Sequence, residues 1–524
     1  MDPVPVLAGI KIRGSPASCL SCVSTGQVLR LISMLPGVHC RYLRIGRSTA
    51  AFLLLFGCAT CSGFNRPEHL RPSEKSGQAG EETTPRFQAA VAAYQAERYG
   101  EAQRELIPLL AANPNSFEIN ELTGLVYVAL GQDEKAHAYL LRAVRLQPGS
   151  AAANTTLAAN LVRLHRNAEA EAEFRKVVEL EPRSYDANHN LGEFYIQNHK
   201  LAEALPYLER AQETNPRAYN NGYDLALAYE QTGNLDKARG QVEQLLKIND
   251  TAELHSLLGE IEESAKNYLV SVAQFEQAAY MDPSESNILE WGVELLLHQT
   301  FEPAVEVFRS GIARYPRSAR LEIGRGIALY GLGHFDDGAR AFFQASDANA
   351  ADPLPLLFLG KAYENLLPPV TDEVRSRLHR FLETGPPNAS VRFYYAMTLW
   401  KQSQVQPETA EWAEIESLLK STVSLDPRNA DAFLQLGILY ANQQKYNDAI
   451  TQYEQALKLN RDNAAIHYRL GQALSRTGAA ERARQEFAEF ERLHAREVED
   501  TAKQTADIQQ FVYTLRHSTL AGKE

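Results

Sequence analysis

The chain has 524 residues and a formal net charge of −12, and its charge is unevenly distributed. The first 66 residues hold seven Lys or Arg against one acid, whereas residues 67–524 hold 46 basic and 64 acidic residues, a charge of −18. An excess of negative charge repels phosphate backbones, which argues against nucleic-acid binding as the main role of residues 67–524.

The first element in chain order is an apolar run at residues 48–57, which follows Arg41, Arg44 and Arg47. A basic stretch followed by a short apolar run is typical of a secretory signal, and this run is too short for a comfortable membrane-spanning helix. We therefore expect residues 1–61 to be a targeting segment. The protein would then be exported, to the periplasm or to the membrane-anchored cell envelope.

The end of this apolar run, Leu55-Phe56-Gly57-Cys58, resembles the signal of bacterial lipoproteins. In that family the cysteine after a small residue is lipidated and becomes the mature amino terminus, so the resemblance implies lipidation at Cys58 and a membrane anchor. Such signals start close to the initiator methionine, which favours Met34 as the true start. Residues 62–82 are rich in Ser, Glu, Gly and Pro and are expected to form a flexible linker.

Beyond the linker, a small residue recurs about every 34 positions. These positions are Ala90, Gly124, Ala158, Gly192, Ala226, Gly259, Gly292, Gly326, Gly360, Ala396, Gly437 and Gly471. A second small residue and then a bulky apolar residue follow most of them at constant spacing, as Ala204 and Leu208 follow Gly192. Small residues let two helices approach closely, and the bulky side chain can fill the space between them. The spacing therefore predicts stacked two-helix repeats.

Prolines predict where each repeat ends. They follow the bulky residue at constant spacing in many repeats, at Pro114, Pro148, Pro182, Pro216, Pro283, Pro316 and Pro427. Because proline cannot continue a helix, we expect the second helix of each repeat to stop just before it.

These positions together resemble the tetratricopeptide repeat family, whose pattern combines a Leu-Gly or Leu-Ala pair, an aromatic residue and the alanines and proline described above. The clearest repeat begins Asn190-Leu191-Gly192-Glu193-Phe194-Tyr195 and continues with Ala204, Leu208, Ala211 and Pro216. The resemblance implies an all-α fold, a right-handed superhelical solenoid of about twelve helix-turn-helix repeats. It would occupy residues 83–495, with a capping helix and tail at residues 496–524.

The resemblance also implies a partner-binding groove, because the first helix of each repeat lines the concave face in this family. The exposed groove positions are expected at Glu118, Glu121, Asp186, His189, Glu193, Asn220, Tyr223, Glu253 and Glu260. Most of these residues are acids, which favours a protein or peptide partner with basic residues. The alternative is that these acids only keep the surface soluble.

Some co-chaperones of this family grip a carboxyl terminus with Lys, Asn and Arg side chains on successive first helices. The corresponding positions here hold Glu121 and Leu125, Thr155 and Ala159, and His189 and Glu193. The carboxylate clamp is therefore absent from the sequence, and an acidic groove would repel such a carboxylate.

Catalytic motifs are also missing: we find no metalloprotease HExxH, no Gly-rich phosphate loop and no nucleophile elbow. The segments outside the repeats are too short for a typical catalytic domain. We therefore expect a non-catalytic scaffold for protein–protein interaction, without a cofactor or metal. The alternative is an accessory subunit that positions an envelope enzyme, such as a glycosyltransferase or a secretion machine.

Overall fold

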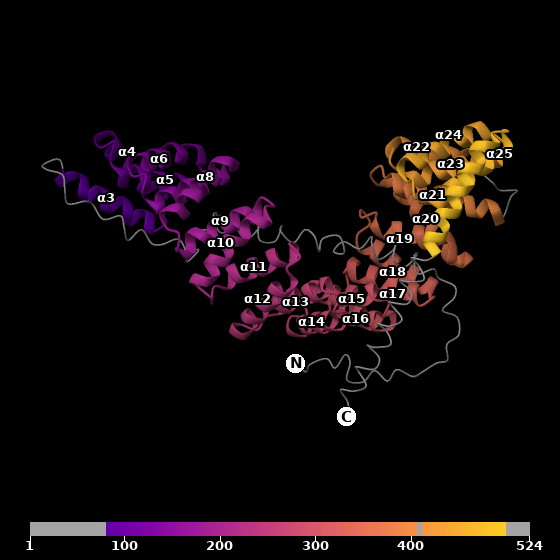
Figure 1. Ribbon diagram of the computed structural model, residues 1–524, viewed down its shortest axis with the longest axis horizontal. Helices are drawn as coiled ribbons and strands as arrows, with labels where there is room; N and C mark the ends of the chain where they lie inside the picture. The colour runs from indigo at the N-terminus through magenta and orange to yellow at the C-terminus, as the bar shows by residue number, and fades with distance from the viewer. Residues whose placement is uncertain (1–79, 406–410, 499–524) are drawn as a thin grey trace, which may run out of the picture. The chain divides into compact units, whose positions relative to one another are not determined.

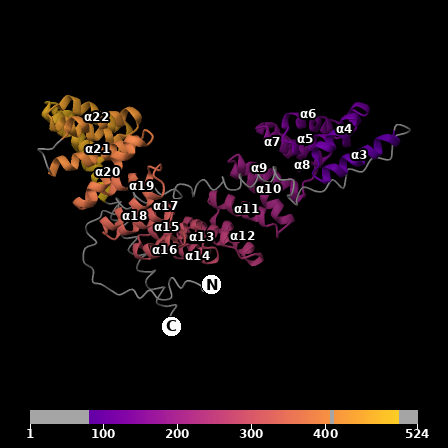
Figure 2. The same cartoon turned by 180° about the vertical axis from the view of Figure 1, so that it is seen from behind.

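The computed structural model describes residues 80–405 and 411–498. The described part of the chain divides into two compact units, one within Cys40–Lys266 and the other within Asn267–Glu524. We refer to them as the 40–266 unit and the 267–524 unit, and each is described by itself. Figure 1 labels their helices, and Figure 2 shows the same helices from behind. Within each unit, helices that follow one another in the chain pack side by side.

The helices of the 40–266 unit are α3 (Gly80–Gln95), α4 (Tyr99–Ala112), α5 (Phe117–Ala129), α6 (Asp133–Leu146), α7 (Ala151–Arg163), α8 (Asn167–Leu180), α9 (Tyr185–Gln197), α10 (Leu201–Thr214), α11 (Tyr219–Gln231), α12 (Leu235–Ile248) and α13 (Ala252–Ser264). Odd-numbered helices are the first helices of the repeats, and even-numbered helices are the second.

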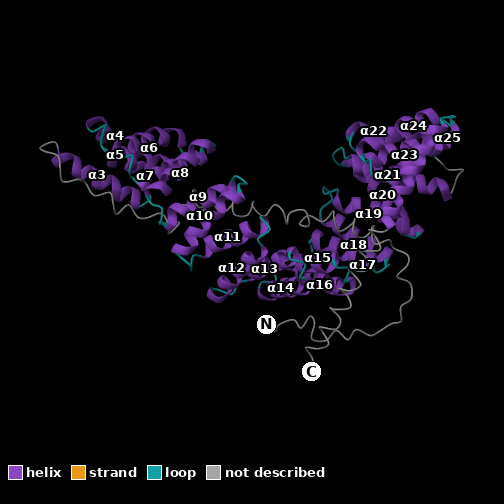
Figure 3. Cartoon of the chain, in the orientation of Figure 1, coloured by secondary structure: helices purple, strands orange, loops and turns teal. Residues whose placement is uncertain are grey.

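The helices of the 267–524 unit are α14 (Tyr268–Met281), α15 (Glu285–Leu297), α16 (Phe301–Arg314), α17 (Ala319–Gly331), α18 (Phe335–Ala348), α19 (Leu354–Ala362), the 3₁₀ turn η2 (Tyr363–Asn365), α20 (Pro368–Thr384), α21 (Ala389–Val405), α22 (Trp412–Leu425), α23 (Ala430–Asn442), α24 (Tyr446–Leu459) and α25 (Ala464–Arg476). A further helix runs from Ala480 to the end of the described residues. Figure 3 shows helices and connecting loops but no strand in the described ranges, which confirms the expected all-α helical repeat solenoid.

Short local signals set the turns between repeats. At the start of α9, the Ser184 hydroxyl accepts a hydrogen bond from the backbone N–H of Ala187 and caps the helix. The Asn188 amide then donates to the carbonyl oxygens of Pro182 and Ser184, at 3.0 and 2.8 Å. The same bonds recur at α5 and α7, through Ser116 with Asn120 and Ser150 with Asn154. These bonds hold the turns before α5, α7 and α9.

The prolines stand where the sequence predicts. Each of the seven follows the end of a second helix by two residues, as Pro216 follows α10, which ends at Thr214. The prediction that they mark the repeat ends is confirmed.

The small residues let the two helices of a repeat pack closely, as expected. A Cβ added at Gly192 would lie 2.5 Å from Cδ2 of Leu208, so the leucine fills the space that a larger residue would need. Equivalent pairs are Gly124 with Leu140, Gly292 with Phe308, Gly326 with Phe342, Gly437 with Tyr453 and Gly471 with Phe487. Gly360 departs from this pattern, since it packs against Tyr394 of α21. Its own helix, α19, ends early in the turn η2.

Several predictions fall outside the described residues. The targeting segment with Cys58, most of the 62–82 linker and nearly all of the 496–524 cap are among them. At the linker, α3 begins at Gly80, two residues before the expected end of that segment. Among the described helices, none combines the length and the apolar character that a membrane crossing requires.

Candidate functional site

Three neighbouring first helices of the 40–266 unit carry most of the predicted groove residues. Helix α11 contacts α9 on one side and α13 on the other. The seven groove residues on these helices are Asp186, His189, Glu193, Asn220, Tyr223, Glu253 and Glu260, whereas Glu118 and Glu121 lie on α5. The structure therefore gathers the predicted residues mainly onto α9, α11 and α13.

Their exposure varies more than the spacing suggests. Asp186, Asn220 and Glu253 are exposed, whereas Glu118, His189, Glu193, Tyr223 and Glu260 are partly buried. Glu121, expected to be exposed, is only 1 % exposed. It precedes Gly124 by three residues and so shares the side of α5 that faces the second helix. Burial, with the nearby charge of Glu118, raises the pKa of Glu121 to about 7.

The prediction from the sequence missed one acid of this region, Asp224 on α11. Asp224 is 7 % exposed, and burial, together with the charge of Glu253, raises the pKa of its carboxyl group to about 7. In the described part of the chain this carboxyl group makes no hydrogen bond and no ion pair. One signal in the sequence could have found Asp224. It lies two residues before the small residue of its repeat, a position that holds Leu122 and Leu257 in other repeats.

Asp224 interacts electrostatically with an acid on each neighbouring first helix. On one side the charge of Asp224 raises the pKa of Glu193, and on the other the charge of Glu253 raises the pKa of Asp224. We call Glu193, Asp224 and Glu253 the acidic face. Burial is the larger cause for Glu193, whose side chain is 12 % exposed and whose pKa rises to about 8. The Gln197 amide donates to Glu193 at 3.5 Å and opposes that rise.

His189 does not neutralise this face. The Asn221 amide group donates to the carbonyl oxygen of Leu208 and to Gln212, at 2.9 and 2.8 Å, so its own oxygen must accept from His189 Nδ1 at 3.1 Å. This assigns the His189 proton to Nδ1. Burial lowers the pKa of His189, which favours the neutral ring, and Nε2 lies 3.9 Å from the Glu193 carboxylate.

Aromatic rings lie beside the acids on the same helices. The Tyr185 ring stacks on His189 with centroids 5.3 Å apart, and Tyr219 stacks on Tyr223 at 6.4 Å. The Tyr219 hydroxyl donates to Glu253 at 3.0 Å. The charge of Asp224 contributes to the raised pKa of Tyr185, which places this ring within electrostatic range of the acidic face. Carboxylates together with aromatic faces are the groups that attract a cation.

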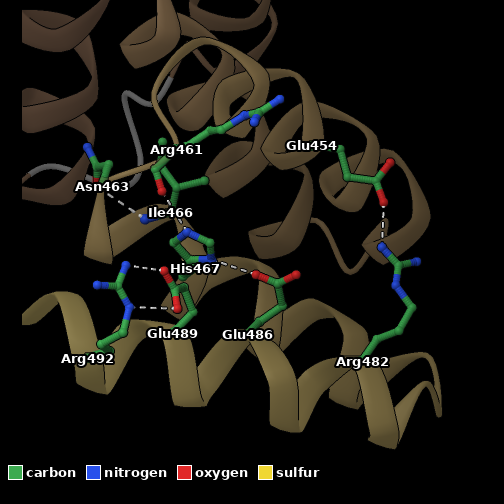
Figure 4. A network of polar contacts seen from close by, with 9 residues as sticks. All are labelled: Glu454, Arg461, Asn463, Ile466, His467, Arg482, Glu486, Glu489 and Arg492. Atoms are coloured by element: carbon green, nitrogen blue, oxygen red, sulfur yellow. Dashed lines mark hydrogen bonds and ion pairs between the residues drawn. The ribbon is translucent and has the colours of Figure 1, made fainter.

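A second polar network, at the end of the 267–524 unit, is internally paired (Figure 4). His467 Nδ1 lies 2.6 Å from the Glu486 carboxylate, and its Nε2 lies 2.9 Å from the carbonyl oxygen of Arg461. Arg482 pairs with Glu454, and Arg492 pairs with Glu489. All of these residues except Arg492 border a surface groove of about 540 Å³. The His467–Glu486 and Arg482–Glu454 contacts join different helices, so this network stabilises the packing of the last helices. Its carboxylates already have basic partners within the fold.

Comparisons with known proteins agree with the repeat pattern. Models of the tetratricopeptide repeat family match residues 87–151 and 155–219, residues 196–261 and residues 439–478. A comparison with curated proteins found no match.

Among solved structures, one similar chain comes from a structure of Naa15/Naa10 bound to HypK-THB. The two chains are 16 % identical, and the match covers 78 % of this chain and 68 % of that chain with a TM-score of 0.36. YrrB, described as a TPR protein with an unusual peptide-binding site, has 19 % identity over 35 % of this chain and 94 % of that chain, with a TM-score of 0.33. A tetratricopeptide repeat protein from Parabacteroides merdae has 17 % identity over 47 % of this chain and 98 % of that chain, with a TM-score of 0.36.

At such low identities and TM-scores, these structures carry no argument about function. Proteins with tetratricopeptide repeats generally mediate protein–protein interaction and are generally non-catalytic. Since family models match four segments of it, the chain contains tetratricopeptide repeats, as the spacing of its small residues and prolines predicted.

Proposed function

We propose that the protein is a non-catalytic scaffold that binds a protein or peptide segment along α9, α11 and α13. The observation that carries this proposal is the acidic face, which places three acids on three neighbouring first helices. In the described part of the chain none of the three is paired with Lys or Arg. An acidic surface without internal basic partners favours a partner segment that carries basic residues.

A random dodecapeptide library displayed on phage, selected against the full chain, tests this proposal. We expect selected peptides to slow amide hydrogen exchange in α9, α11 and α13, because a bound segment would stabilise these helices locally. Peptides that protect only helices of the 267–524 unit, or a selection that yields no binder, would refute binding at this face.

The proposal also places the protein at the bacterial cell envelope. Its support is the arginine cluster, the apolar run and Cys58, all read from the sequence. In the native cell, Cys58→Ala should release the protein from the membrane fraction and abolish labelling by a fatty-acid analogue. Cys61→Ala is the matched control and should change neither. An unprocessed, soluble protein that retains residues 34–57 would contradict the placement.

A further inference from the structure

The starting observation is a buried carboxyl group without a partner. Asp224 is 7 % exposed and, among the described residues, makes neither a hydrogen bond nor an ion pair. The charges acting on it come from acids, Glu253 on α13 and Glu193 on α9. An ionised carboxylate is unfavourable in such a place, since burial removes most of its contact with water and the neighbouring acids repel it.

The groups around Asp224 cannot supply the missing positive charge. His189 uses its Nδ1 proton for Asn221, and burial disfavours its protonated form. The Tyr219 hydroxyl donates to Glu253, and Asn221 uses both amide protons within α10. In the described part of the chain no basic group acts on Asp224, so a positive charge beside it would come from another molecule.

We propose that Asp224 anchors a subsite for a single cationic side chain of the bound segment, a lysine ammonium or an arginine guanidinium, held between Glu193 and Glu253. This inference rests on the proposed function and names the chemistry that the face recognises. A cation placed there interacts favourably with all three carboxylates and replaces their mutual repulsion. The rings of Tyr185, Tyr219 and Tyr223 on the same helices suit the apolar stem of such a side chain and the charge at its end.

Binding at this subsite has a second consequence that can be measured. Without a ligand, burial keeps the pKa of Asp224 at about 7 and that of Glu193 at about 8, so both carry protons for part of the time near neutral pH. A bound cation favours the ionised forms, and protons are then released. Calorimetric titration in buffers of different ionisation enthalpy reports the number of protons released.

The test compares full-length wild type with Asp224→Asn in parallel selections from the dodecapeptide library. The asparagine keeps the shape of the side chain and removes its charge. Glu203→Gln, at an exposed acid on α10, is the control for losing one charge elsewhere in the same unit. We expect wild type and Glu203→Gln to enrich peptides with a Lys or Arg, and Asp224→Asn to show a clearly weaker enrichment.

One selected peptide is then titrated with its basic residue intact and replaced by glutamine. The replacement should weaken binding to wild type by about tenfold or more and abolish proton release, and it should weaken binding to Asp224→Asn by a clearly smaller factor, because Glu193 and Glu253 remain. If Asp224→Asn fails to fold by circular dichroism, Glu193→Gln takes its place in both steps.

The outcomes separate the two proposals. Peptides that protect α9, α11 and α13 but show no preference for Lys or Arg would overturn the cation subsite and leave the scaffold proposal standing. An equal preference for basic residues in wild type and Asp224→Asn would also overturn it. Absence of any binder at this face would overturn the scaffold proposal and the subsite with it.

Discussion

In the 267–524 unit the buried acids on first helices have partners, whereas Asp224 in the 40–266 unit has none among the residues that the structure describes. Glu294 on α15 accepts a hydrogen bond from the Ser271 hydroxyl at 2.7 Å, and Glu322 on α17 pairs with Arg325 at 2.7 Å. Even within the 40–266 unit, Glu262 on α13 forms a two-bond ion pair with Arg239. Burial of an acid is therefore not what distinguishes the proposed binding site. The absence of a donor is the distinguishing property, because a structural acid is satisfied by its own fold.

The largest expected effect tests whether the two units respond independently. Gly192→Trp forces a large side chain against Leu208 and should lower the free energy of unfolding by about 3 kcal/mol or more. Repeats interact mainly with their neighbours, so hydrogen exchange should rise in α9 and α10 before it rises in α23 and α24. Gly240→Ala, at a helical glycine with no atom near the added Cβ, is the control and should stabilise by up to about 1 kcal/mol. A uniform loss of protection in both units would contradict this picture.

The second prediction contrasts a paired acid with the unpaired one. Arg239→Met leaves Glu262 buried without its cation and should destabilise by about 2–3 kcal/mol, less than for a fully buried pair because the Arg239 side chain is 26 % exposed. Asp224→Asn removes an unfavourable charge and should stabilise by about 1–2 kcal/mol at pH 8. Urea unfolding measures both. Two changes of the same sign would show that Asp224 has a partner in the folded protein.

The third prediction concerns pH. Asp224 has an ordinary pKa of 3.8 and a folded pKa of about 7, and Glu193 has 4.5 and about 8. The folded state therefore binds protons more tightly than the unfolded state, so stability from these groups is greatest below about pH 4 and is lost as pH rises to about 8. The double variant Asp224→Asn/Glu193→Gln should flatten this decline. Urea midpoints across the range test it, and an unchanged slope in the double variant would assign the decline to other groups.

The smallest expected effect lies at the start of the helix that carries Asp224. The N-cap of α11 is Ala218, which offers no side-chain hydrogen bond, whereas Ser184 caps α9. Ala218→Ser should stabilise by about 0.5–1 kcal/mol, and Ser184→Ala should destabilise by about the same amount. Thermal unfolding of the two variants should shift in opposite directions. A shift in the same direction would mean that the backbone of residue 218 cannot present a cap.

Much of the fold was predictable because its signals are local. A glycine at position 192 with a leucine at position 208 predicts two closely packed helices wherever the pair recurs, and the structure confirms it. The repeat around Gly360 was less predictable, since the early end of α19 brings Tyr394 of a later helix against that glycine. For the candidate site, the spacing predicted correctly that the groove residues lie on first helices. It did not include Asp224, and it treated the buried Glu121 as exposed.

The amino-acid sequence by itself determined the period of the repeats, the ends of the second helices at their prolines and the acidic character of the first helices. These depend on backbone geometry and on neighbours a few residues away. Only the tertiary structure decided which acids are buried and which have donors. The pKa of Asp224 depends partly on Glu253, and Asp224 in turn affects Glu193, although both glutamates lie about 30 residues away in the sequence. Electrostatic energy depends on distance in space, so only the folded structure brings these charges into range of one another.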